Sequence, residues 1–190
     1  MKIFKIILYI VATLAAMAIF GYTYYGGFRT IQPSIRTCGG EVLVFEKVKG
    51  DYSQSEAVSD RVYDRLRKTF EIETQLGFGI YYDKPGTVPT HELKSDVGCI
   101  LEPTDINRIA DIQREYYVET FPTEPYLVVE FPFKGKASVL VGLMKVYPAI
   151  ESYIKENNYQ LDTPIMEIWD ITNQKTIYRK KLLRQTGSLQ

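Results

Sequence analysis

The sequence predicts an α+β fold in which two β-α-β-β units form a curved antiparallel sheet with two helices on one face, preceded by an N-terminal transmembrane helix. Three observations lead to this prediction. The first 25 residues are almost entirely apolar, the rest of the chain alternates strand-like and helix-like patterns, and the order of these patterns repeats once. Two copies are too few for a solenoid, so the units are expected to join edge to edge.

The composition fits a globular domain with an appendage and gives no support for nucleic-acid binding. The chain has 190 residues, of which 45% are hydrophobic, so it can bury a core. Lysine and arginine total 23, as do aspartate and glutamate, so there is no basic field to hold a nucleic acid. Aromatic residues reach 13% and include 15 tyrosines, which is consistent with an aromatic-lined site.

Residues 1–25 are predicted to form a membrane anchor. Between Ile3 and Phe20 the only charge is Lys5, and an aromatic cluster typical of the headgroup interface follows at 21–25. The alternative is a cleaved signal peptide, with Ala-Met-Ala at 16–18 as its cleavage site. The apolar run continues past this site, as it does in a retained anchor.

Few charges flank the apolar run. Lys2, Lys5 and the amino group precede it, and Arg29 and Arg36 follow it. The positive-inside rule therefore favours an internal amino terminus, with the main domain outside the cytoplasm.

A linker is predicted over 26–39, because this segment has glycines at both ends and Pro33 prevents a continuous helix. The binding domain then covers 40–185, and 186–190 form a short tail. Cys38 and Cys99 match no metal-site spacing. They could form one disulfide or be two unrelated small apolar residues.

The first unit opens with an alternating strand at 41–49. A helix with apolar residues at i, i+4 spacing follows through Phe70, and Ser53 or Ser55 is expected to cap it. Strands at 77–83 and 96–101 complete the unit. The charged segment 103–115 connects the two halves and can contain a short helix.

The second unit repeats this order, with a strand at 126–133, a helix opened by Ala137 or Ser138, and strands at 164–170 and 176–183. The two halves align at matching turns, and Tyr82 then corresponds to Trp169. We expect a pocket near the pseudo-twofold axis on the face opposite the helices, with these two side chains on its two sides.

Glu167 is an unusual residue for its position. In a strand it shares one face with Ile165 and Trp169, and burying an unpaired carboxylate there is costly or raises its pKa. Two interpretations are open. The segment is a pocket wall in which Glu167 meets a cation and Trp169 offers its π face, or it is a half-exposed strand in which Glu167 pairs with a lysine or arginine.

Three segments together resemble the GyrI-like family of small-molecule (effector) binding domains, which are also fused to multidrug-sensing transcription regulators. These segments lie at 79–85, 145–157 and 165–169, and the resemblance covers roughly 40–183. It implies the duplicated β-α-β-β fold and an aromatic pocket for lipophilic, often cationic molecules. It also implies an acidic residue at the pocket floor, which falls on Glu167.

A closer resemblance is to the membrane-anchored branch of this family, typified by a testis-expressed autophagy receptor of the endoplasmic reticulum. The shared features are the anchor, a Tyr-Tyr-Asp-x-Pro strand end followed by Val88-Pro89, and Val-Gly-x-Ile-Leu at 97–101. That receptor acts through a disordered carboxy-terminal tail. Since this sequence ends at Gln190 and has no helix-turn-helix segment before the domain, we expect neither the tail-dependent adaptor role nor a transcription-regulator role.

The sequence therefore predicts a membrane-anchored domain that binds a lipophilic, cationic small molecule, with Glu167, Trp169, Tyr82 and Tyr81 as ligand-binding residues. No catalytic residue, metal site or cofactor is predicted, because His91 is the only histidine and no glycine-rich phosphate loop is present. Two alternatives remain: a small-molecule hydrolase with Glu167 as general base, and a membrane-bound adaptor for a protein partner.

Overall fold

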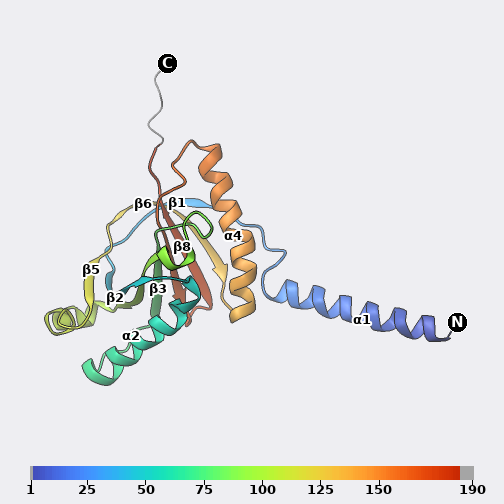
Figure 1. The fold of residues 1–190 in the computed structure, drawn as a ribbon, viewed down its shortest axis with the longest axis horizontal. Helices are drawn as coiled ribbons and strands as arrows, with labels where there is room; N and C mark the ends of the chain where they lie inside the picture. Colours follow the sequence, from blue (N-terminus) through green and yellow to red (C-terminus); the bar gives the residue numbers. More distant parts are fainter. Residues whose placement is uncertain (1, 185–190) are drawn as a thin grey trace, which may run out of the picture.

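The computed structural model describes residues 2–184 and confirms the predicted α+β fold (Figure 1). In this part of the chain eight strands form one antiparallel sheet, in the order β1-β6-β8-β7-β3-β4-β2-β5. The strands are β1 (Ser34–Cys38), β2 (Val42–Lys49), β3 (Leu76–Tyr81), β4 (Lys94–Leu101), β5 (Tyr117–Thr120), β6 (Glu124–Pro132), β7 (Ile165–Asp170) and β8 (Lys175–Lys181). The helices are α1 (Lys2–Tyr24), α2 (Ser55–Phe70), the short α3 (Ile109–Ile112) and α4 (Lys136–Glu156). The predicted tail at 186–190 lies outside the described residues.

The predicted duplication is present in the sheet. The first unit is β2-α2-β3-β4 and the second is β6-α4-β7-β8. Of the three strands in each unit, the first lies farthest from the junction between the units. The units join through antiparallel pairing of β3 with β7, in which Gly79 lies opposite Glu167. An approximate twofold axis therefore passes between these two strands.

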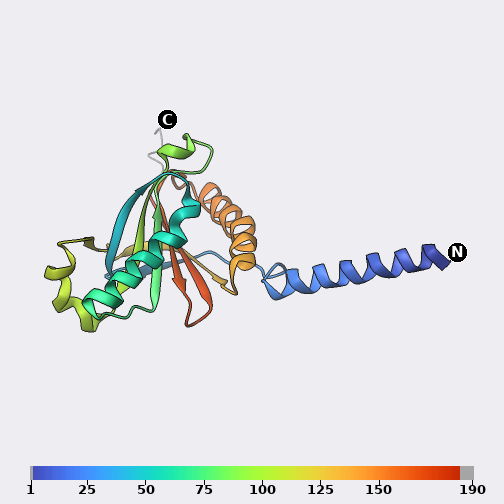
Figure 2. The same ribbon diagram turned by 60° about the horizontal axis from the view of Figure 1, so that its bottom comes forward.

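Helices α2 and α4 cover the same face of the sheet (Figure 2). Val62 and Leu66 of α2 pack on β2 and β4, and Val146 and Ile150 of α4 pack on β6 and β8. A third apolar cluster lies on the opposite face, around Phe78. Because the sheet carries a core on each face, its central strands are buried on both sides, as the burial of β4 and β7 shows.

Two strands extend the predicted units. Strand β1 lies inside the predicted linker 26–39, so the sheet begins before the predicted boundary at 40. It pairs with β6 of the second unit, whereas β5, which precedes that unit, pairs with β2 of the first. Each half therefore supplies an edge strand to the other.

This exchange rolls the sheet. Ser34 of β1 pairs with Val128 of β6, and Val42 of β2 pairs with Thr120 of β5, in one continuous register. The segments β1-β2 and β5-β6 therefore run side by side as two long bent strands. Hydrogen bonds of Phe121 with Gly40 and Glu41 bridge the bend. The beginnings of β2 and β6, although they belong to different halves, consequently meet at one end of the sheet.

Helix α1 is 23 residues long, has no buried residue and is apolar enough to cross a membrane. It projects away from the domain (Figure 1). The following turn contacts the domain, because Lys145 Nζ donates hydrogen bonds to the carbonyls of Gly27 and Arg29, the latter at 2.6 Å. Cys38 and Cys99 are both free thiols, and burial raises the pKa of Cys99 to about 11.

We expect Gly39→Ala to destabilise the domain more than Gly40→Ala. Both glycines have positive φ angles, +129° and +91°, which alanine adopts only with strain. At Gly39 an added Cβ would also overlap the carbonyl of Pro122, which lies in the bend between β5 and β6, whereas at Gly40 its nearest neighbour is a side-chain atom at 3.4 Å.

Overpacking of this kind costs about 1–3 kcal/mol, so we expect Gly39→Ala to lose roughly that much more stability than its neighbour. Urea unfolding of detergent-solubilised protein, followed by Trp169 fluorescence, measures the difference. Equal losses would contradict a tight contact between the two long strands.

Candidate functional site

Glu167 lies in the middle of β7 and on the sheet face that the helices cover. It shares this face with Ile165 and Trp169, as strand alternation predicts, and only 6% of it is exposed. The site lies between α4, which contributes Tyr147, and α2, whose Ser59 lies near the Trp169 ring over Gly77. A half-exposed Glu167 is therefore excluded.

The Glu167 carboxylate accepts hydrogen bonds only from neutral donors among the described residues. The Tyr147 hydroxyl donates to Oε1 at 2.6 Å, and the Trp169 indole N–H donates to Oε2 at 3.4 Å. Glu167 forms no ion pair with any residue that the structure describes. Lys180 is a buried cation on the neighbouring strand, but it donates its hydrogen bond to the Thr163 carbonyl. The charge on Glu167 consequently has hydrogen-bond partners but no counter-ion.

Tyrosines complete the surroundings of the carboxylate. Tyr178 of β8 is the cross-strand partner of Glu167, and its ring meets that of Tyr147 edge to face at 6.0 Å between centroids. Tyr81 of β3 lies on the same face, with its ring 4.6 Å from that of Tyr52. The sequence had indicated Tyr81 and Trp169 but not Tyr147 or Tyr178, because only the folded chain brings α4 and β8 to β7.

Two glycines make room for these rings. Gly77 and Gly79 of β3 lie opposite Trp169 and Glu167 of β7. At these two positions β3 therefore has no side chain beside those of β7. A Cβ on Gly77 would lie 3.0 Å from the Trp169 ring, and one on Gly79 would lie 2.8 Å from the Tyr81 hydroxyl. The aromatic rings therefore occupy space that any larger residue would fill.

Burial dominates the electrostatics of this site. It raises the pKa of Glu167, and the hydrogen bonds from Tyr147 and Trp169 offset only part of that rise. Burial and the neighbouring negative charge together hold the pKa of Tyr147 well above its usual value, so its hydroxyl stays a proton donor. The arrangement favours a neutral carboxyl, or a cation brought close to the carboxylate.

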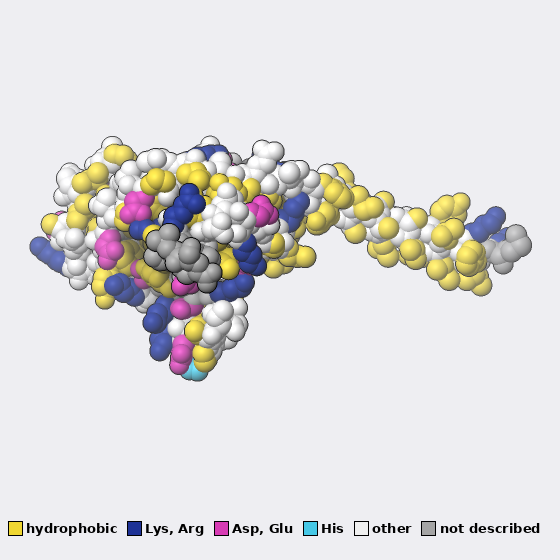
Figure 3. Space-filling model, turned by 90° about the horizontal axis from the view of Figure 1, so that it is seen from above, with side chains coloured by type: hydrophobic (Ala, Val, Ile, Leu, Met, Phe, Trp, Pro, Cys, Tyr) yellow, Lys and Arg dark blue, Asp and Glu magenta, His cyan; other side chains and the backbone are white. Residues whose placement is uncertain are grey.

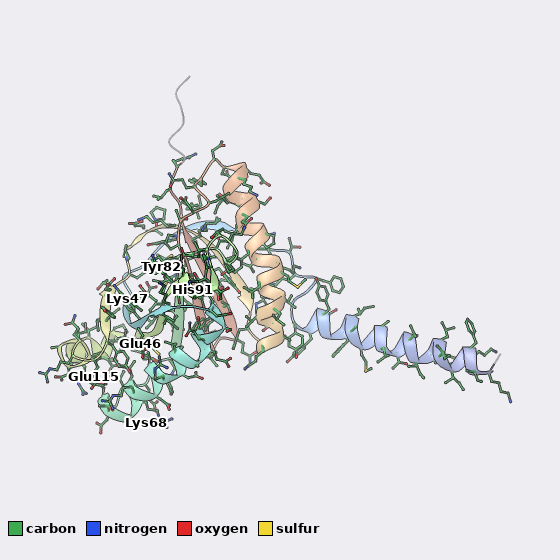
Figure 4. The ribbon with its side chains drawn as sticks, viewed as in Figure 1. Glu46, Lys47, Lys68, Tyr82, His91 and Glu115 are labelled. Atoms are coloured by element: carbon green, nitrogen blue, oxygen red, sulfur yellow. The ribbon has the colours of Figure 1, made fainter. Side chains whose placement is uncertain are left out.

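The structure separates Tyr82 from the other predicted site residues. Tyr82 follows the end of β3, is 41% exposed and donates a hydrogen bond of 2.6 Å to Asp96 on the face opposite the helices. It lies near Lys47 there (Figure 4). Tyr82 and Trp169 consequently do not line one pocket, because strand alternation sends them to opposite faces.

A cavity of about 200 Å³ lies inside the rolled sheet on the Tyr82 face. Apolar side chains such as Phe45 and Met166 line it together with Asp96 and Arg179, and Arg179 forms an ion pair of 2.8 Å with Glu41. Arg179 thus has a counter-ion. Burial raises the pKa of Asp96, as it does for Glu167, but the hydrogen bond from Tyr82 and the nearby cation Lys47 offset part of that rise.

Two curated proteins share part of this sequence. Testis-expressed protein 264 homolog from mouse is 30% identical over 83 residues, which are 40% of this chain and 27% of that protein. Human testis-expressed protein 264 is 31% identical over 83 residues, 40% of this chain and 26% of that protein. The match therefore spans about a quarter of the length of each relative.

Solved structures share the fold at low sequence identity. The C-terminal domain of EcmrR has a TM-score of 0.56 at 10% identity, covering 82% of this chain and 99% of that chain. SAV2435 bound to tetraphenylphosphonium has a TM-score of 0.55 at 14% identity, covering 80% and 94%. A model of the GyrI-like small molecule binding domain matches residues 32–179, which are most of this sequence. The chain therefore belongs to the family of GyrI-like small-molecule-binding domains.

Proposed function

We propose that this protein is a membrane-anchored GyrI-like domain that binds a lipophilic cation against Glu167. The single observation that carries the proposal is the buried carboxylate with two neutral hydrogen-bond donors and no counter-ion among the described residues. A bound cation would compensate the charge that burial leaves unfavourable.

The aromatic residues support a particular class of ligand. Tyr81, Tyr147, Tyr178 and Trp169 offer apolar surface and π faces around one negative charge, which suits a cation that carries aromatic groups. The fold neighbour SAV2435 was solved with such a molecule, tetraphenylphosphonium. This supports the choice of ligand class.

The ligand must displace part of α4 to reach the carboxylate, because Glu167 is covered. Tyr147 is the α4 residue that donates a hydrogen bond to it, and Pro148 follows directly inside the helix. Proline has no N–H, so the Met144 carbonyl lacks its usual helical hydrogen bond. The helix is therefore weakened where Tyr147 must move.

Helix α1 is the proposed anchor. Its length and exposed apolar surface suit a membrane span, and the aromatic residues at its end suit the headgroup region. The charges flanking it favour an internal amino terminus, which would place the domain outside the cytoplasm.

We expect tetraphenylphosphonium to quench Trp169 fluorescence saturably, and Glu167→Gln to weaken its binding by roughly 10- to 100-fold. The substitution keeps the shape but removes the negative charge and replaces one of the two accepting oxygens by an amide NH2, and each 1.4 kcal/mol corresponds to about tenfold in affinity. Neutral triphenylphosphine oxide should bind both proteins about equally. The titration is made on the full chain in detergent.

The matched control is Asp96→Asn, which neutralises the carboxylate on the opposite face of the same sheet. It should leave the affinity for the cation unchanged. A loss with Asp96→Asn but not with Glu167→Gln would move the site to the cavity beside Tyr82. Product formation in the same samples would indicate the hydrolase, and the absence of any ligand response in folded protein would favour the adaptor.

We also expect Glu167→Gln to stabilise the ligand-free protein at neutral and higher pH. The pKa of Glu167 is raised in the folded state, so ionisation of this group opposes folding above its unfolded value near 4.5. The gain should be present at about pH 8 and should shrink as the pH falls and wild-type Glu167 becomes protonated. Thermal unfolding across this pH range measures it, and a destabilised variant would indicate a structural role for the charge.

A further inference from the structure

The two duplicated helices present very different surfaces to their surroundings. Around α2 the exposed residues are charged and paired, as in the ion pairs of Arg61 with Glu46 and of Arg65 with Glu115 (Figure 4). The first half of α4 instead exposes Leu140, Leu143 and Met144, at 63%, 42% and 76%. These three residues are called the α4 stripe below.

The α4 stripe lies on one side of its helix. Residues 140, 143 and 144 follow the i, i+3, i+4 spacing of a single helical face, and Pro148 continues that face one turn later. No charged residue occurs between Lys136 and Lys145. Since α4 already buries Val146 and Ile150 against the sheet, this second apolar face has no role in the core.

The α4 stripe is adjacent to the end of α1. Lys145 holds the turn after α1 through the carbonyls of Gly27 and Arg29, and Lys134 Nζ lies 4.2 Å from the centre of the Tyr24 ring. In two views α4 is on the side of the domain that faces α1, and its axis runs across that of α1 (Figures 1 and 2). A helix beside the end of a spanning helix and across its axis lies parallel to the membrane plane.

The side chains around this junction are those of a membrane interface. Tyr24 and Phe28 are exposed together with Lys134 and Lys136. Aromatic and basic residues in this combination concentrate at lipid headgroups. Figure 3 shows hydrophobic side chains continuing from α1 onto the adjoining part of the domain.

We propose that the α4 stripe lies in the headgroup region of the bilayer, so that α4 is an interfacial helix and the domain sits directly on the membrane. This inference rests on the anchoring proposed above and adds an orientation to it. The occupant of the stripe is lipid, because the stripe continues the surface of the spanning helix and is bordered by the residues that headgroups select.

The orientation gives the binding site a route of entry. Tyr147, which donates a hydrogen bond to Glu167, directly follows the stripe and Lys145 on α4. A lipophilic cation partitions into the headgroup region, where it would meet the helix that must move to admit it. The ligand would thus reach Glu167 from the membrane side.

The test places an NBD fluorophore on single cysteines of the full chain, in a Cys38→Ser, Cys99→Ala background reconstituted into phosphatidylcholine vesicles. The reporters on the stripe are Met144→Cys and, independently, Leu140→Cys. Lys68→Cys on α2 is the water-exposed control, and Leu14→Cys in α1 is the membrane control. Quenching is measured with lipids that carry a doxyl group near the headgroup or at mid-chain.

We expect both stripe reporters to be quenched by the shallow doxyl lipid at least about twofold more than the Lys68→Cys reporter, and less by the deep one. Stripe reporters that behave like Lys68→Cys, while Leu14→Cys is quenched by the deep lipid, would overturn this inference and leave the anchor intact. An unquenched Leu14→Cys would overturn the anchor and the orientation together. Neither result would affect cation binding at Glu167, which the detergent titration measures.

Discussion

The pairing of β3 with β7 is the constraint on which the rest of the structure depends. It joins the two halves of the domain, and the same hydrogen-bonded ladder places Gly77 and Gly79 opposite Trp169 and Glu167. Room for the aromatic rings and the position of the carboxylate are therefore fixed by one register. A shift of this pairing by one residue would send Glu167 to the other face of the sheet, where Met166 now packs.

A buried charge at this junction is tolerated because the stability of the domain comes from elsewhere. Separate apolar clusters lie under α2, under α4 and on the opposite face of the sheet, and the exchange of β1 and β5 ties the two halves together at one end. Glu167 lies between these clusters and contributes to none of them. The unfavourable ionisation of Glu167 is thus a local property of the site, which a ligand can relieve without rebuilding the core.

Strong local patterns made most of the fold predictable from the sequence. The duplicated sheet was predictable from the alternation in β2, the helical spacing in α2 and the repeated order of elements. Glu167 was predictable as a candidate site residue because it is a carboxylate inside an apolar stretch. Strands β1 and β5 escaped prediction because they are short and mostly exposed, and pairing with the opposite half of the chain defines them. The start of α2 differs from the prediction that Ser53 or Ser55 caps the helix. The Asp51 carboxylate instead accepts a hydrogen bond from the Ser53 N–H at the start of a 3-10 turn that leads into α2.

The difference between the two duplicated helices relates the proposed site to the proposed membrane surface. Duplication supplies two helices in equivalent positions, so features that only one of them has are not required by the fold. Helix α2 keeps a solvated surface of ion pairs, whereas α4 combines an exposed apolar stripe, an internal proline and the tyrosine that donates to Glu167. These three features would be unrelated if α4 only covered the sheet. They fit together if α4 is the element through which a lipophilic cation passes from the bilayer surface to the buried carboxylate.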